Sequence, residues 1–502
     1  MSLSEPTEEP RYIETRSKET NHPYQPLAPE DIHKIHETTM QVLEEVGFEV
    51  HEPEAFELFR RTDAKVDSER RVVRLKEYVV RDLIASAPTE INLFGLDEDR
   101  VLRLGTSEVY CGTGGTALNV LDYESGQCRP AQLEDLVDVI RIVDVLENVH
   151  LMLLPTYPNE LPVESVDVNR FFAGFMHTGK HVMGGVYTSK GIRDVIAMAE
   201  RIAGSPEALR ERPFLSMITC GISPLRLDSK YGAFMIQVAR EGIPVAVPAE
   251  PLCGATSPVT LAGNLVIQNA DGLINVMLTQ LANPGTPVIY GCVATSTDLR
   301  DLNYLGGPVE SGMINAATAQ LAQYYGIPYY ATAGISDSKT LDAQCGYESA
   351  INNLLVVLSG ADFIHDAAGL MEFALTVSKE KLVIDNEIIG MALRASRGIE
   401  VNEETLAFDV IRRVGPGGNF IAARHTRKHM HPEHYRPRLS DREKRESWER
   451  DGQVSSAERA HRIVKKILGK PKRTYLSGAV ARELIQAFPA IESRHYRETT
   501  HA

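Results

Sequence analysis

Several side chains that can bind or react with a small molecule follow short apolar runs of this sequence. Glu250 stands in Pro248-Ala249-Glu250-Pro251 directly after one run, and His365 with Asp366 ends another. A carboxylate there can supply a counter-charge, and an imidazole can donate a hydrogen bond to an anion. The structural alternatives are a salt bridge or helix cap for Glu250, and for His365 a hydrogen bond to Asp366. We take Glu250 and His365 as the candidate catalytic residues.

Tyrosines recur at the same positions, whereas fixed cations are few. Tyr157, Tyr187, Tyr290 and Tyr330 lie in or just after apolar runs, and Lys339 is the main cation near them. Aromatic faces attract quaternary ammonium ions, whereas a phosphate site would need Arg, Lys or a glycine-rich helix start. Each tyrosine taken singly is more typical of core packing, so only their clustering favours a cation-binding pocket.

The runs that carry these residues are predicted strands of a barrel. Eight apolar, β-branched runs alternate with amphipathic helical segments over about 250 residues, which is typical of an α/β fold, the TIM (β/α)8 barrel. Active sites of such barrels lie at the carboxyl ends of the strands, so the residues after each run are the candidates. The first strand lies within Glu108–Asp122, and the others are Val149–Leu154, His181–Tyr187, Phe214–Thr219, Pro244–Val247, Pro287–Val293, Tyr329–Ala333 and Asp362–His365.

The chain is longer than a barrel requires, and the excess lies on both sides of it. The pattern predicts a flexible arm over residues 1–27, a mainly helical lead-in over 28–107, the barrel over 108–375 and a C-terminal helical extension over 376–502. We expect Val101–Leu104 and Ala117–Asp122 to form a hairpin layer that closes the barrel bottom. Glu404–Val414 is predicted to be one helix of the extension.

Composition excludes several classes of function. Lys and Arg number 53 against 68 Asp and Glu, and a net charge of −15 argues against nucleic-acid or anionic-membrane partners. No run approaches the roughly 20 apolar residues of a membrane span, and the first 27 residues lack the apolar core of a signal peptide. The six cysteines stand apart without a C-x-x-C pair. We therefore expect a cytoplasmic protein without a bound metal.

Several separated blocks of sequence are distinctive. The longest runs from Ala333 to Glu348, across the end of the predicted seventh strand. The others are Gly112-Thr113-Gly114-Gly115, Ala255–Gly263, Gly417–Ile421 with His425 and Thr426 after it, Arg438–Arg442 and Trp448. Together, from about Pro29 to Gly452, they resemble the trimethylamine methyltransferase superfamily.

This resemblance implies a TIM barrel that moves a methyl group from a methylamine to the corrinoid (cobalamin) of a separate protein. Founding members carry pyrrolysine near the seventh strand, whereas this chain has only standard residues over Tyr330–Asp337. A quaternary ammonium needs less activation than a tertiary amine, because displacement at its methyl carbon expels a neutral amine. The resemblance therefore implies a non-pyrrolysine, glycine betaine methyltransferase-like enzyme, which holds no covalent cofactor and acts on Co(I) of a corrinoid partner.

Roles for the candidate residues follow from this resemblance. The four tyrosines would wall the ammonium, and Glu250 would supply the counter-charge. Donors for a betaine carboxylate would be His365, Lys339 or the backbone amides of Gly114 and Gly115. Asp337 and Gln344, which follow the seventh strand, would shape the site or anchor its loop.

Other features leave alternatives open. The charged segment Arg424–Arg450 is either solvated helix and loop or a docking surface for the corrinoid partner. A barrel of this size is expected to form a homo-oligomer. A quaternary-amine binding or sensing protein on the same fold, and a zinc-dependent barrel methyltransferase acting on a thiol, are the two alternative functions.

Overall fold

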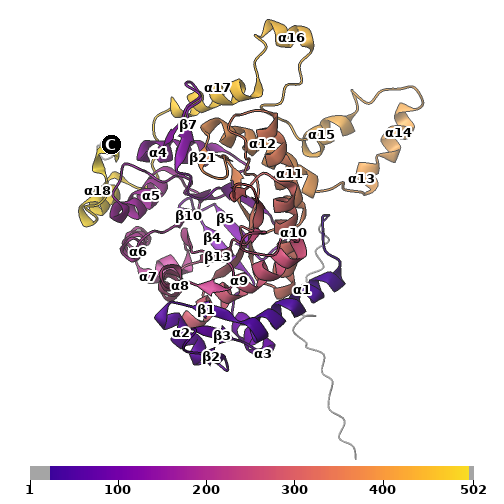
Figure 1. Ribbon diagram of the computed structural model, residues 1–502. Coiled ribbons are helices and arrows are strands. Elements are labelled where there is room, and N and C mark those ends of the chain that lie inside the picture. The colour runs from indigo at the N-terminus through magenta and orange to yellow at the C-terminus, as the bar shows by residue number, and fades with distance from the viewer. Residues whose placement is uncertain (1–22, 497–502) are drawn as a thin grey trace, which may run out of the picture.

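Eight parallel strands form a nearly closed barrel at the centre of the molecule (Figure 1). The computed structural model describes residues 23–496, so most of the predicted arm over residues 1–27 lies outside the described part. A bridge between Gly112 and Leu151 links the first two barrel segments of the chain. In order around the barrel, the strands are β6 (Tyr110–Thr113), β19 (Phe363–Ala368), β18 (Tyr329–Thr332), β15 (Val288–Cys292), β13 (Val245–Ala249), β11 (Leu215–Ile218), β10 (Val182–Gly185) and β9 (Met152–Leu153). The predicted barrel is confirmed, and its first strand is β6.

A ring of helices covers the outside of these strands (Figure 1). Helix α9 is buried on almost every side, with Asp271 as its one charged residue, because both the barrel and the lead-in cover it. A helix with one covered face needs only one apolar stripe, so this sequence pattern reflects two-sided burial. The ring consists of α4 (Leu133–Val145), α5 (Val163–His177), α6 (Ser189–Ala203), α7 (Pro206–Glu211), α8 (Ser229–Glu241), α9 (Leu261–Ala282), α10 (Val309–Tyr325), α11 (Ala343–Leu358) and α12 (Lys379–Ser396).

The lead-in packs three helices and a small sheet against the barrel. Its helices contact α9, and the amide of Asn269 on α9 donates to Thr39 Oγ1 at 3.0 Å. The elements are α1 (Pro29–Gln41), the π-helical turn η1 (Val42–Val46), α2 (Pro53–Arg60), α3 (Glu77–Ile84), and a four-stranded sheet of β1 (Phe48–Val50), β2 (Lys65–Asp67), β3 (Val72–Arg74) and β12 (Arg226–Leu227). The helical lead-in therefore also contains strands.

A hairpin closes the amino-terminal end of the barrel, but its strands differ from the prediction. β5 (Val101–Leu104) pairs with β4 (Ile91–Phe94), whose Leu93 packs among the interior residues Leu151 and Phe363. Alternating burial along β4 gives it the apolar face that this position requires. The predicted partner of β5 instead contributes β7 (Asn119–Leu121), which joins β8 (Cys128–Pro130), β21 (Thr376–Val377) and β20 (Leu370–Met371).

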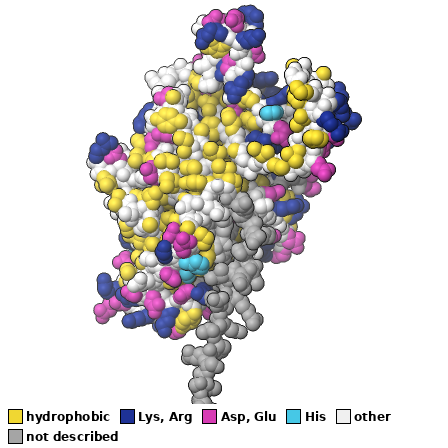
Figure 2. Space-filling view, turned by 90° about the vertical axis from the view of Figure 1, so that its right-hand side faces the viewer, with side chains coloured by type: hydrophobic (Ala, Val, Ile, Leu, Met, Phe, Trp, Pro, Cys, Tyr) yellow, Lys and Arg dark blue, Asp and Glu magenta, His cyan; other side chains and the backbone are white. Residues whose placement is uncertain are grey.

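The C-terminal extension leaves the barrel and then returns to it. The predicted helix over Glu404–Val414 is divided at Ala407, where φ is 53°. Figure 1 shows α13 (Glu403–Leu406), α14 (Phe408–Val414) and α16 (Arg445–Arg450) standing away from the ring, and Figure 2 shows hydrophobic side chains gathered beside them. α15 (Arg424–Glu433) lies next to α12, whose Arg394 donates to the carbonyl oxygen of Glu433 at 2.8 Å. The chain then forms α17 (Ser456–Leu468), which packs on α12 and α4, α18 (Gly478–Ala487) and the 3-10 turn η2 (Ser493–Tyr496). Within residues 23–496, every helix is too short or too polar to cross a membrane.

Candidate functional site

Glu250 follows β13 at the mouth of the barrel. Ala246 faces the barrel interior, so the alternation of the strand carries Glu250 to the same side. Its side chain is exposed to solvent, yet burial by the surrounding protein and the nearby Asp366 raise its pKa to about 7, with His365 acting in the opposite direction. A carboxyl group that solvent reaches but protein surrounds lies in a recess. Within residues 23–496 it has no ion pair, so the salt-bridge alternative is not observed.

His365 and Asp366 are neighbours in β19, and both side chains reach the barrel mouth. In a regular strand they would point to opposite faces. The register between β19 and β6 shifts between Ile364 and Ala368, and Asp366 has a φ of 57°. A bulge re-aims side chains, and aspartate tolerates this left-handed backbone better than most residues. As a result, His365 Nε2 lies 2.9 Å from Asp366 Oδ2.

Both ring nitrogens of His365 lie within hydrogen-bond distance of protein groups. Its Nδ1 lies 2.8 Å from the carbonyl oxygen of Ala331 and 3.1 Å from Thr332 Oγ1. The ring also stacks on Tyr330, with centroids 4.2 Å apart and planes at 23°. Protein groups occupy both ring nitrogens, so the predicted contact of His365 with a substrate carboxylate is not supported.

Asp366 also accepts a hydrogen bond from the glycine-rich turn that follows β6. The amide of Gly115 donates to Asp366 Oδ1 at 2.8 Å. A Cβ atom at Gly114 would collide with the Asp366 carboxylate and the Leu370 side chain, so only glycine fits there. The Gly115 amide, predicted to bind a substrate carboxylate, therefore holds Asp366 in place instead.

A hairpin inserted between β15 and α10 brings Tyr304 close to the two carboxylates. It consists of β16 (Thr295–Asp298) and β17 (Asn303–Leu305), and β14 (Leu252–Cys253) pairs with β16. The side chain of Tyr304 is partly exposed, and burial followed by the charges of Glu250 and Asp366 raises its pKa well above the usual value. The hydroxyl of Tyr304 therefore stays protonated and can donate.

Asp337 and Gln344 hold this hairpin in position. The Asp337 carboxylate accepts from the amides of Gly306 at 2.9 Å and Gly307 at 3.2 Å, directly after β17. Gln344 donates to Glu348 at 2.9 Å, and Glu348 accepts from the amide of Asp337 at 2.9 Å. These contacts favour the anchoring role of the two roles expected for Asp337 and Gln344.

Tyr157 and Tyr187 lie together at the ends of β9 and β10. Their rings meet edge to face, with centroids 5.2 Å apart and planes at 84°, and both are partly exposed. The Tyr187 hydroxyl donates to Thr116 Oγ1 at 2.8 Å, and the guanidinium of the buried Arg170 lies 5.4 Å from its ring centroid. One face of Tyr187 therefore already contacts a cation. Tyr231 of α8 is a further partly exposed ring, and burial raises the pKa of its hydroxyl, which lies near Cys220 and Asp228.

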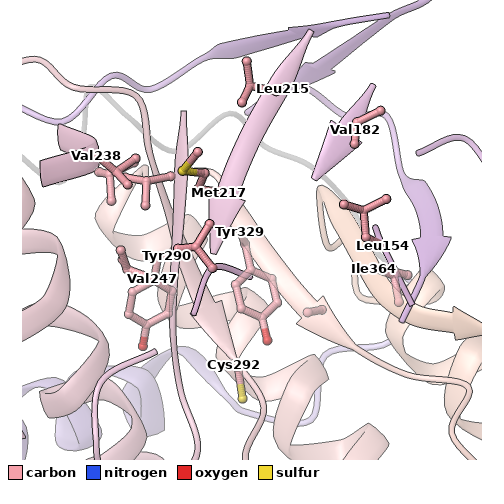
Figure 3. Close-up of a cluster of buried hydrophobic side chains, with 14 of the residues drawn as sticks. Leu154, Val182, Leu215, Met217, Val238, Val247, Tyr290, Cys292, Tyr329 and Ile364 are labelled. Carbon is pink, nitrogen blue, oxygen red and sulfur yellow. The ribbon is translucent and has the colours of Figure 1, made fainter. Parts of the chain in front are cut away.

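The three other predicted residues have different surroundings. Tyr290 points outward and donates to Asn269 of α9 at 3.1 Å, and Figure 3 shows it beside Tyr329 in the buried layer. Since Ile289 faces the barrel interior, strand alternation forces Tyr290 to the helix side. Tyr330 lies buried in the barrel interior, stacks on the His365 ring, and has its hydroxyl near Asp366 and Tyr304. Lys339 is exposed and donates to the carbonyl oxygen of Asp337 at 2.8 Å.

Sequence reasoning missed Tyr304 and Arg170, although both leave a signal. The segment between β15 and α10 covers residues 293–308, much longer than the usual 2–6 residues of a strand-to-helix loop, which are roughly typical values. Long loops in barrels often carry function, so Tyr304 was identifiable as a candidate. Arg170 stands with Asp167 in a largely apolar helix, where charged residues need buried partners.

The strand-end cysteines do not gather into a metal site. Cys220 follows β11 near Glu250 and Asp366, whereas Cys292 lies in the barrel wall, 3.7 Å from Thr318 Oγ1. Burial raises the pKa of the Cys220 thiol to about 12, so this thiol stays protonated. Over residues 23–496, no group of three or more His, Cys, Asp or Glu residues is placed to hold a metal ion. The described residues thus offer no ligand set for the zinc-dependent alternative.

Comparison with known proteins identifies relatives of the whole barrel and its flanking parts. The family profile described as trimethylamine methyltransferase (MTTB) matches residues 5–495. A trimethylamine methyltransferase of Desulfitobacterium hafniense is 36% identical over 432 residues, covering 86% of this chain and 87% of that protein. A glycine betaine methyltransferase from another strain of this species is 32% identical over 479 residues, covering 95% and 98%. The structure of the Methanosarcina barkeri monomethylamine methyltransferase aligns with 75% of this chain and 81% of its own, at 12% identity and a TM-score of 0.47. From the profile match and the first two relatives, this chain belongs to the trimethylamine methyltransferase family.

Proposed function

We propose that this methyltransferase takes an N-methyl group from a quaternary amine, glycine betaine or a related betaine, and transfers it to Co(I) of a separate corrinoid protein. The recessed carboxyl group of Glu250 carries the proposal, because within the described chain it forms no ion pair. A quaternary ammonium has no N–H group, so only charge and ring faces can bind it. Tyr157 and Tyr304 supply partly exposed rings at the same end of the barrel.

The residues present fit a reaction that needs positioning more than acid–base chemistry. The corrinoid of the partner would supply the nucleophile, which forms a bond to the methyl carbon as the carbon–nitrogen bond breaks. The bonding electrons stay on nitrogen, so a neutral tertiary amine leaves and no proton moves. The attraction between Glu250 and the nitrogen falls as the positive charge is lost, so Glu250 acts in binding. The rate advantage comes from holding the methyl group in line and removing water from the cation.

The carboxylate end of a betaine needs donors that the protein does not use itself. In the described part of the chain, the hydroxyls of Tyr157 and Tyr304 have no hydrogen-bond partner among the protein groups. Burial raises the pKa of both hydroxyls, so both remain protonated donors. We assign the carboxylate to these hydroxyls in place of His365 and Gly115, whose donors are occupied.

The corrinoid partner has to present its cofactor at the barrel mouth. The segment Arg424–Arg450 contains α15 and α16, which bury no residue. α16 stands away from the barrel (Figure 1), whereas the end of α15 is held to α12 by the ion pair of Arg394 with Glu433. The segment is therefore accessible to a partner, and a solvated segment without a partner is the alternative.

Free cob(I)alamin provides the test. The purified protein is mixed with cob(I)alamin under reducing, anoxic conditions and with glycine betaine, carnitine, choline or trimethylamine, and the visible spectrum is followed. We expect methylcobalamin to form with a betaine and not with trimethylamine. Glu250→Gln should slow the reaction, whereas Glu211→Gln, an exposed carboxylate elsewhere, should not. Turnover of trimethylamine alone would exclude the proposal, and betaine binding without turnover, with or without the partner, would favour the sensor.

A further inference from the structure

Helix α11 presents an apolar face to solvent. Tyr347, Ile351 and Leu354 follow one another at helical spacing, and 55%, 44% and 37% of their surfaces are exposed. The one charged residue of this helix, Glu348, turns toward the barrel loop and accepts from Ser336 Oγ at 2.7 Å. An outer helix of a barrel normally turns polar residues to water. The outer face of α11 is therefore as apolar as a surface that packs against another protein.

The neighbouring helix α12 extends this face. It packs against α11 and leaves Ile384 and Ile388 partly exposed and Met391 exposed, again at helical spacing. Figure 2 looks at this side of the molecule and shows hydrophobic side chains gathered over a broad area. Contiguous apolar patches larger than a few hundred Å² are rare on monomeric proteins. We call these residues of α11 and α12 the α11–α12 face.

A second apolar surface begins where α12 ends. The arm, residues 397–423, stands away from the barrel in Figure 1. Six of its large apolar side chains are between 53% and 86% exposed, namely Ile399, Val401, Leu406, Phe408, Ile411 and Ile421. Helix α14 has seven residues and none of them is buried. An isolated helix shorter than about 12 residues is marginal in water, so α14 needs a covering surface.

Contacts with α15 keep the arm extended. Glu404 of α13 forms an ion pair with Lys428, and His429 Nε2 lies 3.2 Å from the same carboxylate. His425 Nε2 lies 3.1 Å from the carbonyl oxygen of Glu404. These contacts fix the base of the arm and leave the apolar side of α14 uncovered. The arm is thus preformed for a partner that lies beyond its own chain.

We propose that a second copy of this chain is that partner, with the arm of each copy lying on the α11–α12 face of the other. Both apolar surfaces occur on one chain and meet at the end of α12, so a twofold axis can exchange them. The exposed side chains of the α11–α12 face are largely uncharged, as in permanent interfaces rather than transient ones. The arm carries charged residues of both signs around its apolar side chains, among them Asp409 and Arg412, which pair with each other. Two copies that each carry a net charge of −15 repel one another overall, so the uncharged α11–α12 face is a surface where they can approach closely.

The position of the interface is also compatible with activity. The α11–α12 face lies on the outer wall of the barrel, whereas Glu250 and Tyr304 lie at its mouth. Two copies joined in this way leave both mouths open to substrate. The α11–α12 face and the arm contain none of the residues assigned to the substrate.

Light scattering of the full-length protein after size exclusion tests the proposal. The chain has a mass of 55.5 kDa, so the exchanged pair has 111 kDa. We expect at least 111 kDa for the unaltered protein, and 55.5 kDa for Ile351→Asp on the face and for Ile411→Asp on the arm. Val163→Asp on α5 makes the same change at a site that is 48% exposed and should not alter the mass. Circular dichroism establishes that each variant is folded.

Mixing the variants distinguishes arm exchange from other contacts. The Ile351→Asp chain keeps an intact arm, and the Ile411→Asp chain keeps an intact face. Their mixture should therefore form pairs that neither variant forms alone. An unaltered protein of 55.5 kDa, or full assembly of either variant, would overturn the proposal. Two monomeric variants whose mixture forms no pairs would also overturn it.

Discussion

Protonation of Glu250 should control the affinity for a quaternary ammonium ion. Burial and the charge of Asp366 raise the pKa of Glu250 to about 7 in the ligand-free protein. A permanent cation binds the ionised form, and the ionised fraction is about nine-tenths at pH 8 and about one-tenth at pH 6. The apparent affinity should therefore fall by about tenfold, equivalent to about 1.4 kcal/mol, between pH 8 and pH 6.

Calorimetric titration with glycine betaine at pH 6, 7 and 8 measures this dependence, since neither end of that ligand titrates in the range. Glu250→Gln should weaken binding at pH 8 and remove the pH dependence, because an amide has no charge to lose. Glu211→Gln on the protein surface serves as the matched control and should behave as the unaltered protein. Constant affinity from pH 6 to 8, or an unchanged slope in Glu250→Gln, would refute the role of this carboxylate.

Three further substitutions test the site and its support. Tyr304→Leu should weaken betaine binding by roughly 2- to 30-fold through loss of its ring face, and equal affinity by calorimetry would remove Tyr304 from the site. Lys381→Met should lower the free energy of unfolding in urea by about 3–5 kcal/mol, because it leaves the buried Asp385, 2.7 Å from Lys381 Nζ, without its partner. Adding Asp385→Leu should restore stability, and a single substitution without effect would contradict this expectation. Asp271→Asn should stabilise the protein by about 2–4 kcal/mol above pH 7, because burial raises the pKa of this carboxyl to about 7 and its ionisation then opposes folding. That gain should shrink toward pH 4 in thermal unfolding, and a gain independent of pH would show that ionisation is not its cause.

The alternation of apolar runs and helices was sufficient to predict the barrel. Each run is a strand buried on both faces, so it reads as a short hydrophobic segment whatever its partners are. The order of the runs then locates the carboxyl ends of the strands, which is why Glu250 and His365 were identifiable without coordinates. The family was likewise recognisable from blocks such as Ala333–Glu348, because these are local strings of residues.

The direction of individual side chains was decided by the tertiary structure. Tyr290 and Tyr304 are both tyrosines close to the sixth barrel strand, but Tyr290 faces a helix and Tyr304 approaches Glu250. The alternation of side chains along β15 sets the direction of Tyr290. The inserted hairpin, held by Asp337, sets the position of Tyr304. Neither is readable from local composition, since a shift of one residue exchanges the two faces of a strand.

The bulge in β19 shows most clearly how contacts between strands set the direction of side chains. The sequence places His365 and Asp366 at a strand end, and regular alternation would separate them. Pairing with β6 shifts the register and turns both side chains to the mouth, where Asp366 takes the Gly115 amide and one nitrogen of His365. Residue types and their positions along the chain thus determined the barrel and the end that holds its site. Which donors stay free for a ligand depended on contacts between residues as far apart as Gly115 and Asp366, which only the folded chain brings together.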